Sequence, residues 1–224
     1  MARNKVFVQR LGSVEYDDAL VMQQQAADSC REDNTAHLLL LEHPHTYTLG
    51  ARGDIGHLLA DEARLRQLGA TVRHTSRGGD ITYHGPGQLV GYPILDLRSW
   101  HEGPRWYVRS LEQVLIDTLA AFGISGRREQ GRPGVWAGGS KIAAIGVHIS
   151  RGITSHGFAL NVDPDLDYFS HIVPCGLLDV TVTSMSRELG RPVEMPPVMD
   201  AVEVAFDRVF GLANERRPVE VLVG

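Results

Sequence analysis

The sequence predicts an α/β or α+β fold in which helices flank a mixed β-sheet. Apolar or alternating runs typical of strands follow one another through most of the chain, and three longer helical patterns are spread among them. Strands and helices do not alternate regularly, as they would in repeated βαβ units. The chain contains no repeat, low-complexity segment or flexible linker. We therefore expect residues 1–224 to form a single domain, with room for a small C-terminal subdomain.

In the N-terminal part, a strand, a long helix and a buried strand are expected in turn. Apolar and polar residues alternate at 4–10, which predicts the first strand. Ser13 is a candidate N-cap for a helix that runs to about residue 31. Cys30 falls on the apolar stripe of this helix, and we interpret it as a small core residue rather than a catalytic one. The continuous apolar run 38–41 is typical of a strand buried on both faces.

Two histidines flank Pro44, after which a second short strand is expected. His43 and His45 could form a metal-binding pair, but no matching cluster of Cys, Asp or Glu lies nearby in the sequence. We therefore interpret both as loop histidines.

The next segment is rich in glycine. A short helix at 58–68, which Gly69 can end, and a strand at 71–75 lead into the sequence RGGDITYHGPGQL at 77–89. Here two glycine turns bracket a four-residue strand, and the pattern matches neither a phosphate loop nor a dinucleotide fingerprint. Polar and aromatic residues flank the turns: Arg77, Tyr83, His84 and Gln88. They favour a ligand-binding loop over a pair of plain hairpin turns.

The second half of the chain repeats the mixture of strands and helices. Pro104 suits the first turn of a helix, and Gly123 suits its end. The expected elements are, in order, a strand at 89–97, a helix from Pro104 to Phe122, a short strand at 124–128, a hairpin of 134–136 with 141–149, a strand at 153–162, an irregular stretch from Asp163, a short helix capped by Thr183 or Ser184, a helix at 197–210 and a last strand at 219–223.

Lys141 is unusual for this chain. Only two of its 22 basic residues, Lys5 and Lys141, are lysines. Lys141 lies in an apolar segment, where a buried lysine can lose its proton and act as a base, which arginine cannot do. The alternative is a lysine on an edge strand, where its charge prevents strand pairing between molecules.

Cys175 is the second candidate reactive residue. It lies between Pro174 and Gly176 in an expected loop, rather than on a periodic element as Cys30 does. A nearby cation would lower the thiol pKa from about 8.5 and make it a useful nucleophile. The candidate partners are Lys141, His84, His148, His156 and His171. The sequence leaves open which of them is close, and whether the thiol is instead inert. Two cysteines suggest neither a disulfide framework nor a thiolate metal site.

A lysine partner suits acyl transfer to an amine. An alkyl amine is protonated at neutral pH and must lose its proton as it attacks. One lysine could first stabilise the thiolate as a cation and then accept that proton as a base.

Four motifs together resemble the octanoyltransferases of lipoate biosynthesis (lipoyl/octanoyl transferases). They are RGGDITYHGPGQL at 77–89, SKIAAIG at 140–146, HGFALN at 156–161 and PCG at 174–176. The match follows the family in order and spacing over nearly the whole chain, with LEHP at 41–44 upstream and VTS at 182–184 downstream. Asp80 is the position within these motifs at which we expect the family to vary.

The resemblance implies the mixed sheet and flanking helices of the biotin/lipoate protein ligase superfamily. It implies transfer of an octanoyl group from octanoyl-acyl carrier protein to the lysine of lipoyl domains of 2-oxoacid dehydrogenase complexes and of glycine cleavage H protein. Cys175 would carry the acyl thioester, and Lys141 would lower its pKa and act as acid and base. The acyl pocket would be lined by Arg77, Gly78, Gly79, Asp80, Ile81, Thr82, Tyr83, His84, Ala144, Ile145, Gly146, Gly157, Phe158 and Ala159. No metal or cofactor is implied.

Three rival functions remain open: an ATP-dependent lipoate or biotin ligase, a cysteine thioesterase, and a non-catalytic carrier-protein binder. Bulk properties narrow the setting. The hydrophobic content of 43% predicts a packed core, and the net charge of −5 argues against general affinity for nucleic acid or anionic membranes. No apolar run approaches the roughly 20 residues of a membrane span, and the N-terminus shows no signal-peptide pattern. We expect a cytoplasmic monomer.

Overall fold

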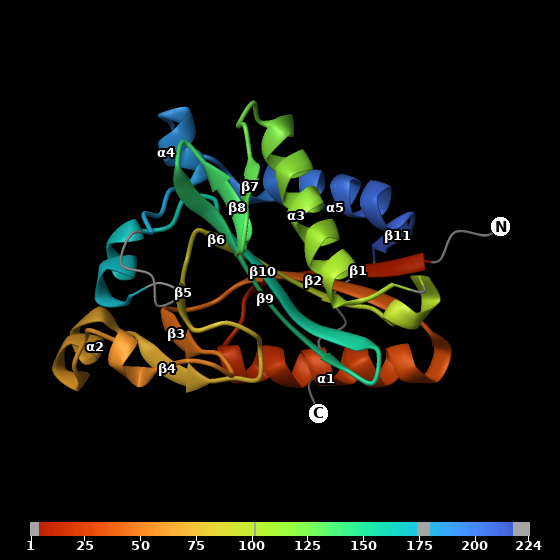
Figure 1. Ribbon diagram of the computed structural model, residues 1–224, viewed down its shortest axis with the longest axis horizontal. Coiled ribbons are helices and arrows are strands. Elements are labelled where there is room, and N and C mark those ends of the chain that lie inside the picture. The colour runs from red at the N-terminus through yellow and green to blue at the C-terminus, as the bar shows by residue number, and fades with distance from the viewer. Residues whose placement is uncertain (1–4, 101, 174–179, 217–224) are drawn as a thin grey trace.

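The computed structural model describes residues 5–100, 102–173 and 180–216 (Figure 1). Its main sheet has eight strands in the order β11-β1-β2-β6-β10-β9-β8-β7, and a second sheet has the order β4-β3-β5. The strands are β1 (Lys5–Ser13), β2 (Ala36–Glu42), β3 (Thr46–Leu49), β4 (Thr71–His74), β5 (Ile81–His84), β6 (Gln88–Ile94), β7 (Arg127–Glu129), β8 (Arg132–Ala137), β9 (Ser140–Ser150), β10 (Ile153–Asn161) and β11 (Ala213–Arg216). The helices are α1 (Tyr16–Asp33), α2 (Glu62–Leu68), α3 (Pro104–Ala121), α4 (Met185–Leu189) and α5 (Met195–Phe210), with 3-10 turns η1 (Ile55–His57), η2 (Leu97–Trp100) and η3 (Leu166–His171).

The main sheet is mixed, as the sequence predicts. Strand β1 runs parallel to both β11 and β2, whereas the remaining neighbours, from β2 through β6, β10, β9 and β8 to β7, pair antiparallel. Helices α3 and α5 cover one face of this sheet, and α1 covers the other (Figure 1). The fold class predicted from the sequence is therefore confirmed.

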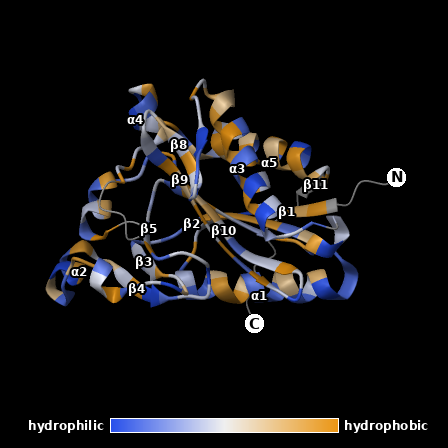
Figure 2. Ribbon diagram, viewed as in Figure 1, coloured by the Kyte–Doolittle hydropathy of each residue, from blue (hydrophilic) through white to orange (hydrophobic). Residues whose placement is uncertain are grey.

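Strand β2 is covered on both faces, which explains its continuous apolar sequence. Leu38 and Leu40 belong to the core on the α3 and α5 side, while Leu39 and Leu41 pack with Ala19 of α1 on the other side. All four leucines are buried. A strand covered on both faces needs apolar residues at every position. In Figure 2, by contrast, α1 and α3 each carry hydrophilic as well as hydrophobic residues, as helices with one face on a sheet do.

Glycine and proline mark helix ends as expected. Helix α3 carries Pro104 in its first turn, and α2 ends at Gly69, whose φ of 61° is left-handed. Several expected boundaries are wrong. The strand expected at 89–97 is β6, which ends at Ile94, before the turn η2. Helix α2 begins at Glu62 rather than at 58, because the Asp61 carboxylate accepts the N–H of Arg64 and caps the helix there.

Ser13 does not cap α1. It is the last residue of β1, where it pairs with Glu42 after a register shift. The chain is still extended at Ser13, so its hydroxyl cannot reach the first turn of α1. The capping residue is Glu15, which makes no side-chain capping bond.

Cys30 is buried in α1 beside Ile94 and Ile153, which confirms its interpretation as a core residue. Burial, and secondarily the Asp96 carboxylate, raise the pKa of its thiol to about 11. The expected strand at 219–223 lies outside the described residues. In the part of the chain that the structure describes, no helix is both long and apolar enough to cross a membrane.

Candidate active site

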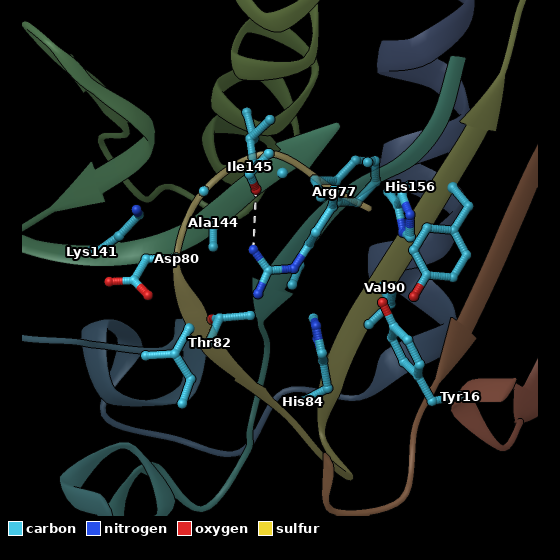
Figure 3. Close-up of a pocket in the computed structure, with 18 residues that line it drawn as sticks. Tyr16, Arg77, Asp80, Thr82, His84, Val90, Lys141, Ala144, Ile145 and His156 are labelled. Carbon is cyan, nitrogen blue, oxygen red and sulfur yellow. Dashed lines mark hydrogen bonds between the residues drawn. The ribbon is translucent and has the colours of Figure 1, made fainter. Parts of the chain in front are cut away.

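A pocket opens between the start of α1, the small sheet and strands β9 and β10 (Figure 3). We call it the main pocket. It is lined by Tyr16, Arg77, Gly78, Gly79, Asp80, Ile81, Thr82, His84, Val90, Tyr92, Lys141, Ala144, Ile145, Gly146, His156, Gly157, Phe158 and Ala159. Lys141 and Asp80 lie at one end, and Tyr16 and His156 lie at the other (Figure 3). The pocket therefore has a charged end and an aromatic end.

Lys141 is the second residue of β9, and its backbone is paired on both sides. It lies opposite Trp136 of β8, and on its other side it donates its N–H to the Thr181 carbonyl at 2.8 Å and accepts the N–H of Thr183 at 3.0 Å. An edge-strand lysine is therefore the wrong interpretation. The side chain is buried, and its Nζ lies 5.8 Å from the centroid of the Trp136 ring, within range of a cation–π interaction.

Gly134 makes room for this lysine. A Cβ at Gly134 would lie 2.8 Å from Cε of Lys141 and 2.4 Å from the Ala143 carbonyl oxygen. Its φ of 123° is also one that other residues rarely adopt. The β8–β9 hairpin thus holds the ammonium in the pocket by close packing as well as by strand pairing.

The glycine-rich segment 77–80 forms one wall of the pocket. Gly78 donates its N–H to the Val147 carbonyl at 2.9 Å, which fixes the segment to β9. Arg77 is buried and donates from Nη2 to the Thr48 carbonyl at 2.6 Å, and from Nη1 to the Gly78 carbonyl at 3.1 Å (dashed line, Figure 3). These contacts hold the segment against the pocket; that it is a ligand-binding loop stays a prediction.

Asp80 links this wall to the turn η1. One carboxylate oxygen accepts the Asp54 N–H at 3.0 Å, and the other lies 2.5 Å from His57 Nδ1, which donates to it. The His57 carbonyl in turn accepts the N–H of Val173 at 2.8 Å. Asp80 therefore connects the main pocket to the residue that immediately precedes segment 174–179.

Cys175 lies outside the described residues, within segment 174–179. Described residues on both sides of this segment are held by backbone hydrogen bonds. Val173 is bonded to η1, and Thr181 is bonded to the backbone of Lys141. The hydroxyls of Ser140 and Thr181, 2.7 Å apart, strengthen the second attachment.

A network of buried polar side chains also holds the backbone near Thr181, at Thr183. His84 donates from Nδ1 to Gln88 Oε1 at 2.8 Å, and Gln88 donates to Asn161 Oδ1 at 2.9 Å. Asn161 then donates to the Thr183 carbonyl at 3.0 Å. All four residues are buried. Fully satisfied buried networks of this kind hold their members in one arrangement.

The histidine and tyrosine rings at the aromatic end of the pocket are neutral at neutral pH, although the Arg77 guanidinium lies close to them. Burial lowers the pKa of His84 well below its ordinary value, with His43 and Arg77 adding to the effect, and burial raises the pKa of Tyr92. For His156, burial and then the Arg77 guanidinium lower the pKa to about 4. Neutral rings in a desolvated pocket suit a hydrocarbon better than a polar ligand.

The two histidines at 43 and 45 differ in burial. Both ring nitrogens of His43 are engaged: Nδ1 donates to the Val14 carbonyl, and Nε2 accepts from the Tyr92 hydroxyl, each at 2.7 Å. Both histidines lie in the loop between β2 and β3, as interpreted from the sequence, but His43 is fully buried and has a structural role there, whereas His45 is half-buried. Within the described residues, no group of three or more His, Cys, Asp or Glu side chains is placed to hold a metal ion.

Comparison with known proteins identifies the family. Residues 15–207 match the model of the lipoyl protein ligase A/B catalytic domain, which covers most of the chain. The chain belongs to this family. An octanoyltransferase from Solibacter usitatus is 52% identical over 204 residues, covering 91% of this chain and 92% of that protein. One from Gloeobacter violaceus is 49% identical over 217 residues, covering 93% and 92%. The expected octanoyltransferase family is confirmed.

Solved structures of the family confirm the fold. A T. acidophilum protein with bound lipoic acid, described as a candidate lipoate protein ligase, matches with a TM-score of 0.76, at 16% identity over 98% of this chain and 91% of that chain. A lipoate-protein ligase A bound with ATP matches with a TM-score of 0.70, at 15% identity over 97% and 90%. The mixed sheet with flanking helices is thus the catalytic fold of lipoate ligases.

Most residues that the octanoyltransferase motifs suggest for the acyl pocket do line the main pocket. Tyr83 does not. Its ring lies in the core of the small sheet, stacked on Tyr168 at 4.9 Å, and its hydroxyl is 2.7 Å from His45 Nδ1. Successive side chains of a strand point to opposite faces, so Tyr83 points away from the pocket while its neighbours Thr82 and His84 line it.

Four further lining residues were not expected from the motifs: Tyr16, Val90, Tyr92 and His156. In the sequence, His156 is a candidate partner of Cys175 and not a predicted pocket residue. His156 does carry a sequence signal, because it begins the HGFALN motif and directly precedes Gly157, a predicted pocket residue. Tyr16 and Tyr92 carry no such signal, since they come from separate elements that only the folded chain brings together.

Proposed function

We propose that the protein transfers an octanoyl group from octanoyl-acyl carrier protein to the lysine of lipoyl carrier domains, through a thioester on Cys175. The observation that carries this proposal is Lys141, a buried lysine in the main pocket whose backbone is bonded to Thr181, six residues after the cysteine. The relatives of about 50% identity, all octanoyltransferases by name, support the same activity.

The first half-reaction forms the thioester on the enzyme. The Cys175 thiolate, stabilised by the Lys141 ammonium, attacks the carbonyl carbon of the octanoyl thioester. The carbon–sulfur bond to the carrier breaks, and the departing carrier thiolate takes a proton from Lys141. Lys141 is then neutral.

The second half-reaction transfers the acyl group to nitrogen. The acceptor lysine amine attacks the Cys175 thioester, and Lys141 accepts the proton that this nitrogen releases. An amide forms, the thiolate of Cys175 leaves, and the original ion pair is restored. Because the donor is already an activated thioester, no nucleotide enters either step.

The main pocket suits the acyl group. Its neutral aromatic rings offer a desolvated surface to the hydrocarbon chain, and the carbonyl would react at the other end, beside Lys141. Burial of each methylene group contributes about 0.8 kcal/mol. Hydrophobic burial therefore supplies much of the affinity for an eight-carbon chain.

Intact-mass spectrometry tests the proposal. After mixing with octanoyl-carrier protein, the wild type is expected to gain one octanoyl group and Cys175→Ser none. Cys30→Ala is the matched control, since it removes the other cysteine, and it should still be acylated. Addition of a lipoyl domain should then move the acyl group to that domain without ATP. Absence of an adduct together with an ATP requirement would support a ligase instead, and release of free octanoate would support a thioesterase.

A further inference from the structure

A second cavity of about 340 Å³ lies between α1 and strands β9 and β10. It is lined by Leu20, Gln23, Gln24, Ala27, Arg31, Ser76, His148, Ser150, Ile153, Thr154, Ser155 and His156. No step of the proposed reaction uses it. A cavity that just holds one water molecule has about 10–15 Å³ of such volume, so this one has room for several methylene groups.

The two cavities follow one another along the same elements. On β10, residues 156–159 line the main pocket and residues 153–156 line the second cavity. On β9, residues 144–146 line the first, and His148 and Ser150 line the second. Among the described lining residues, His156 is the one that the two cavities share. Its imidazole therefore lies where they meet.

The backbone of His156 is in an unusual conformation. Its φ is 55°, a left-handed value that residues with a Cβ rarely adopt, so the backbone is strained here. Its N–H donates to Gln23 Oε1 of α1 at 2.7 Å. Helix α1 thus holds this strained residue in place from across the cavity.

The imidazole is fixed on one edge. Nε2 lies 3.3 Å from the Ser76 hydroxyl and 3.4 Å from that of Thr75, and the Tyr92 ring packs edge-on at 6.2 Å. Two buried polar atoms that line the second cavity, His156 Nδ1 and Gln23 Nε2, make no hydrogen bond. The ring is thus held against the loop before Arg77 and separates the two spaces.

We propose that His156 is a partition that limits the length of the acyl chain. This inference rests on the proposed function and extends it to substrate selectivity. A chain longer than eight carbons would meet the imidazole, whereas removal of the ring would join the main pocket to the second cavity. The occupant of the joined space would be the distal methylene groups of a longer saturated acyl chain, in contact with Leu20, Ala27 and Ile153.

The test compares His156→Gly with the wild type. Glycine adopts a positive φ without strain, so this substitution removes the partition and suits the backbone. Octanoyl-, decanoyl-, dodecanoyl- and tetradecanoyl-carrier proteins are supplied, and acylation of Cys175 is followed by intact mass. A dodecanoyl chain is four methylene groups longer than an octanoyl chain. Each buried methylene group adds about 0.8 kcal/mol, so burial of only two of the four corresponds to about a tenfold rise in preference. We expect the dodecanoyl-to-octanoyl rate ratio to rise by about tenfold or more.

His148→Ala is the matched control, because His148 lines only the second cavity. This variant should keep the dodecanoyl-to-octanoyl rate ratio of the wild type. An unchanged ratio in folded His156→Gly would overturn the partition. If that variant does not fold, His156→Asn, which also tolerates a left-handed backbone, is measured in its place.

A second measurement separates this inference from the proposed function. Octanoate and dodecanoate are titrated into Cys175→Ala and into Cys175→Ala with His156→Gly. The second variant is expected to gain affinity for dodecanoate relative to octanoate by about tenfold. Equal relative affinities in both variants would refute the partition even if the wild type transfers octanoyl groups. A wild type that accepts no acyl group from any carrier would instead refute the proposed function.

Discussion

At the scale of single residues, Lys141 carries two proposed roles that differ in chemistry. Lys141→Arg keeps the cation but removes a group that can accept a proton. We expect acyl transfer to the amine to fall by about 100-fold or more, within the usual range for loss of a general base, and thioester formation to fall much less. Single-turnover kinetics of each half-reaction measure the two effects.

Lys5→Arg is the matched control, since Lys5 is the other lysine of the chain. It should change neither half-reaction. Equal losses in both half-reactions of Lys141→Arg would contradict the second role of this lysine.

His43 makes stability depend on pH. Burial lowers its pKa to about 4, whereas the unfolded chain has a histidine pKa of about 6.5. Between these values the unfolded state binds a proton that the folded state does not, so the free energy of unfolding falls as the pH falls from 6.5 to 4. His156 adds to the effect in the same window. Each histidine contributes at most about 1.4 kcal/mol per pH unit.

Urea denaturation between pH 7 and 4.5 measures this slope. His43→Asn removes the titrating group, while the amide N–H can still donate to the Val14 carbonyl as Nδ1 does. In this variant, the slope of the free energy of unfolding against pH should be smaller by up to about 1.4 kcal/mol per pH unit, the contribution of one histidine. A slope identical to that of the wild type would show that His43 does not titrate in this window.

At the scale of elements, the close approach of β10 and β6 depends on Gly157. A Cβ there would lie 2.2 Å from the Gly91 carbonyl oxygen and 2.6 Å from Pro93 Cδ. Gly157→Ala should lower the free energy of unfolding by about 2–3 kcal/mol, as overpacking against backbone does. Chemical denaturation provides the value. Gly103→Ala, where a Cβ meets nothing within 4 Å, should have a much smaller effect.

Elements were predictable where local chemistry decides them. The glycine at 69 and the proline at 104 mark helix ends from within their own segments. The predicted N-cap at Ser13 is wrong because pairing with β2, a distant segment, extends β1 to that residue. Tyr83 was wrongly expected to line the pocket, because a contiguous motif suggests that all its residues share one function. Its ring lies instead in the core of the small sheet.

At the scale of the whole molecule, the site is an assembly of distant segments. Backbone hydrogen bonds hold Lys141 of β9 beside Thr181, and loop 77–80 against Val147. Neither contact has a local sequence signal. For the same reason the sequence does not predict that Tyr16, from α1, lines the pocket. The single domain over residues 1–224 and the monomeric state stay predictions.

The transfer of one acyl group from enzyme to acceptor tests the central claim most directly. Octanoyl-enzyme is prepared from the wild type, freed of carrier protein and mixed with a lipoyl domain in the absence of ATP. The octanoyl mass is expected to leave the Cys175 peptide and to appear in equal amount on the acceptor lysine. An acyl group that stays on the enzyme, that resides on another residue or that is released as free octanoate would contradict the account.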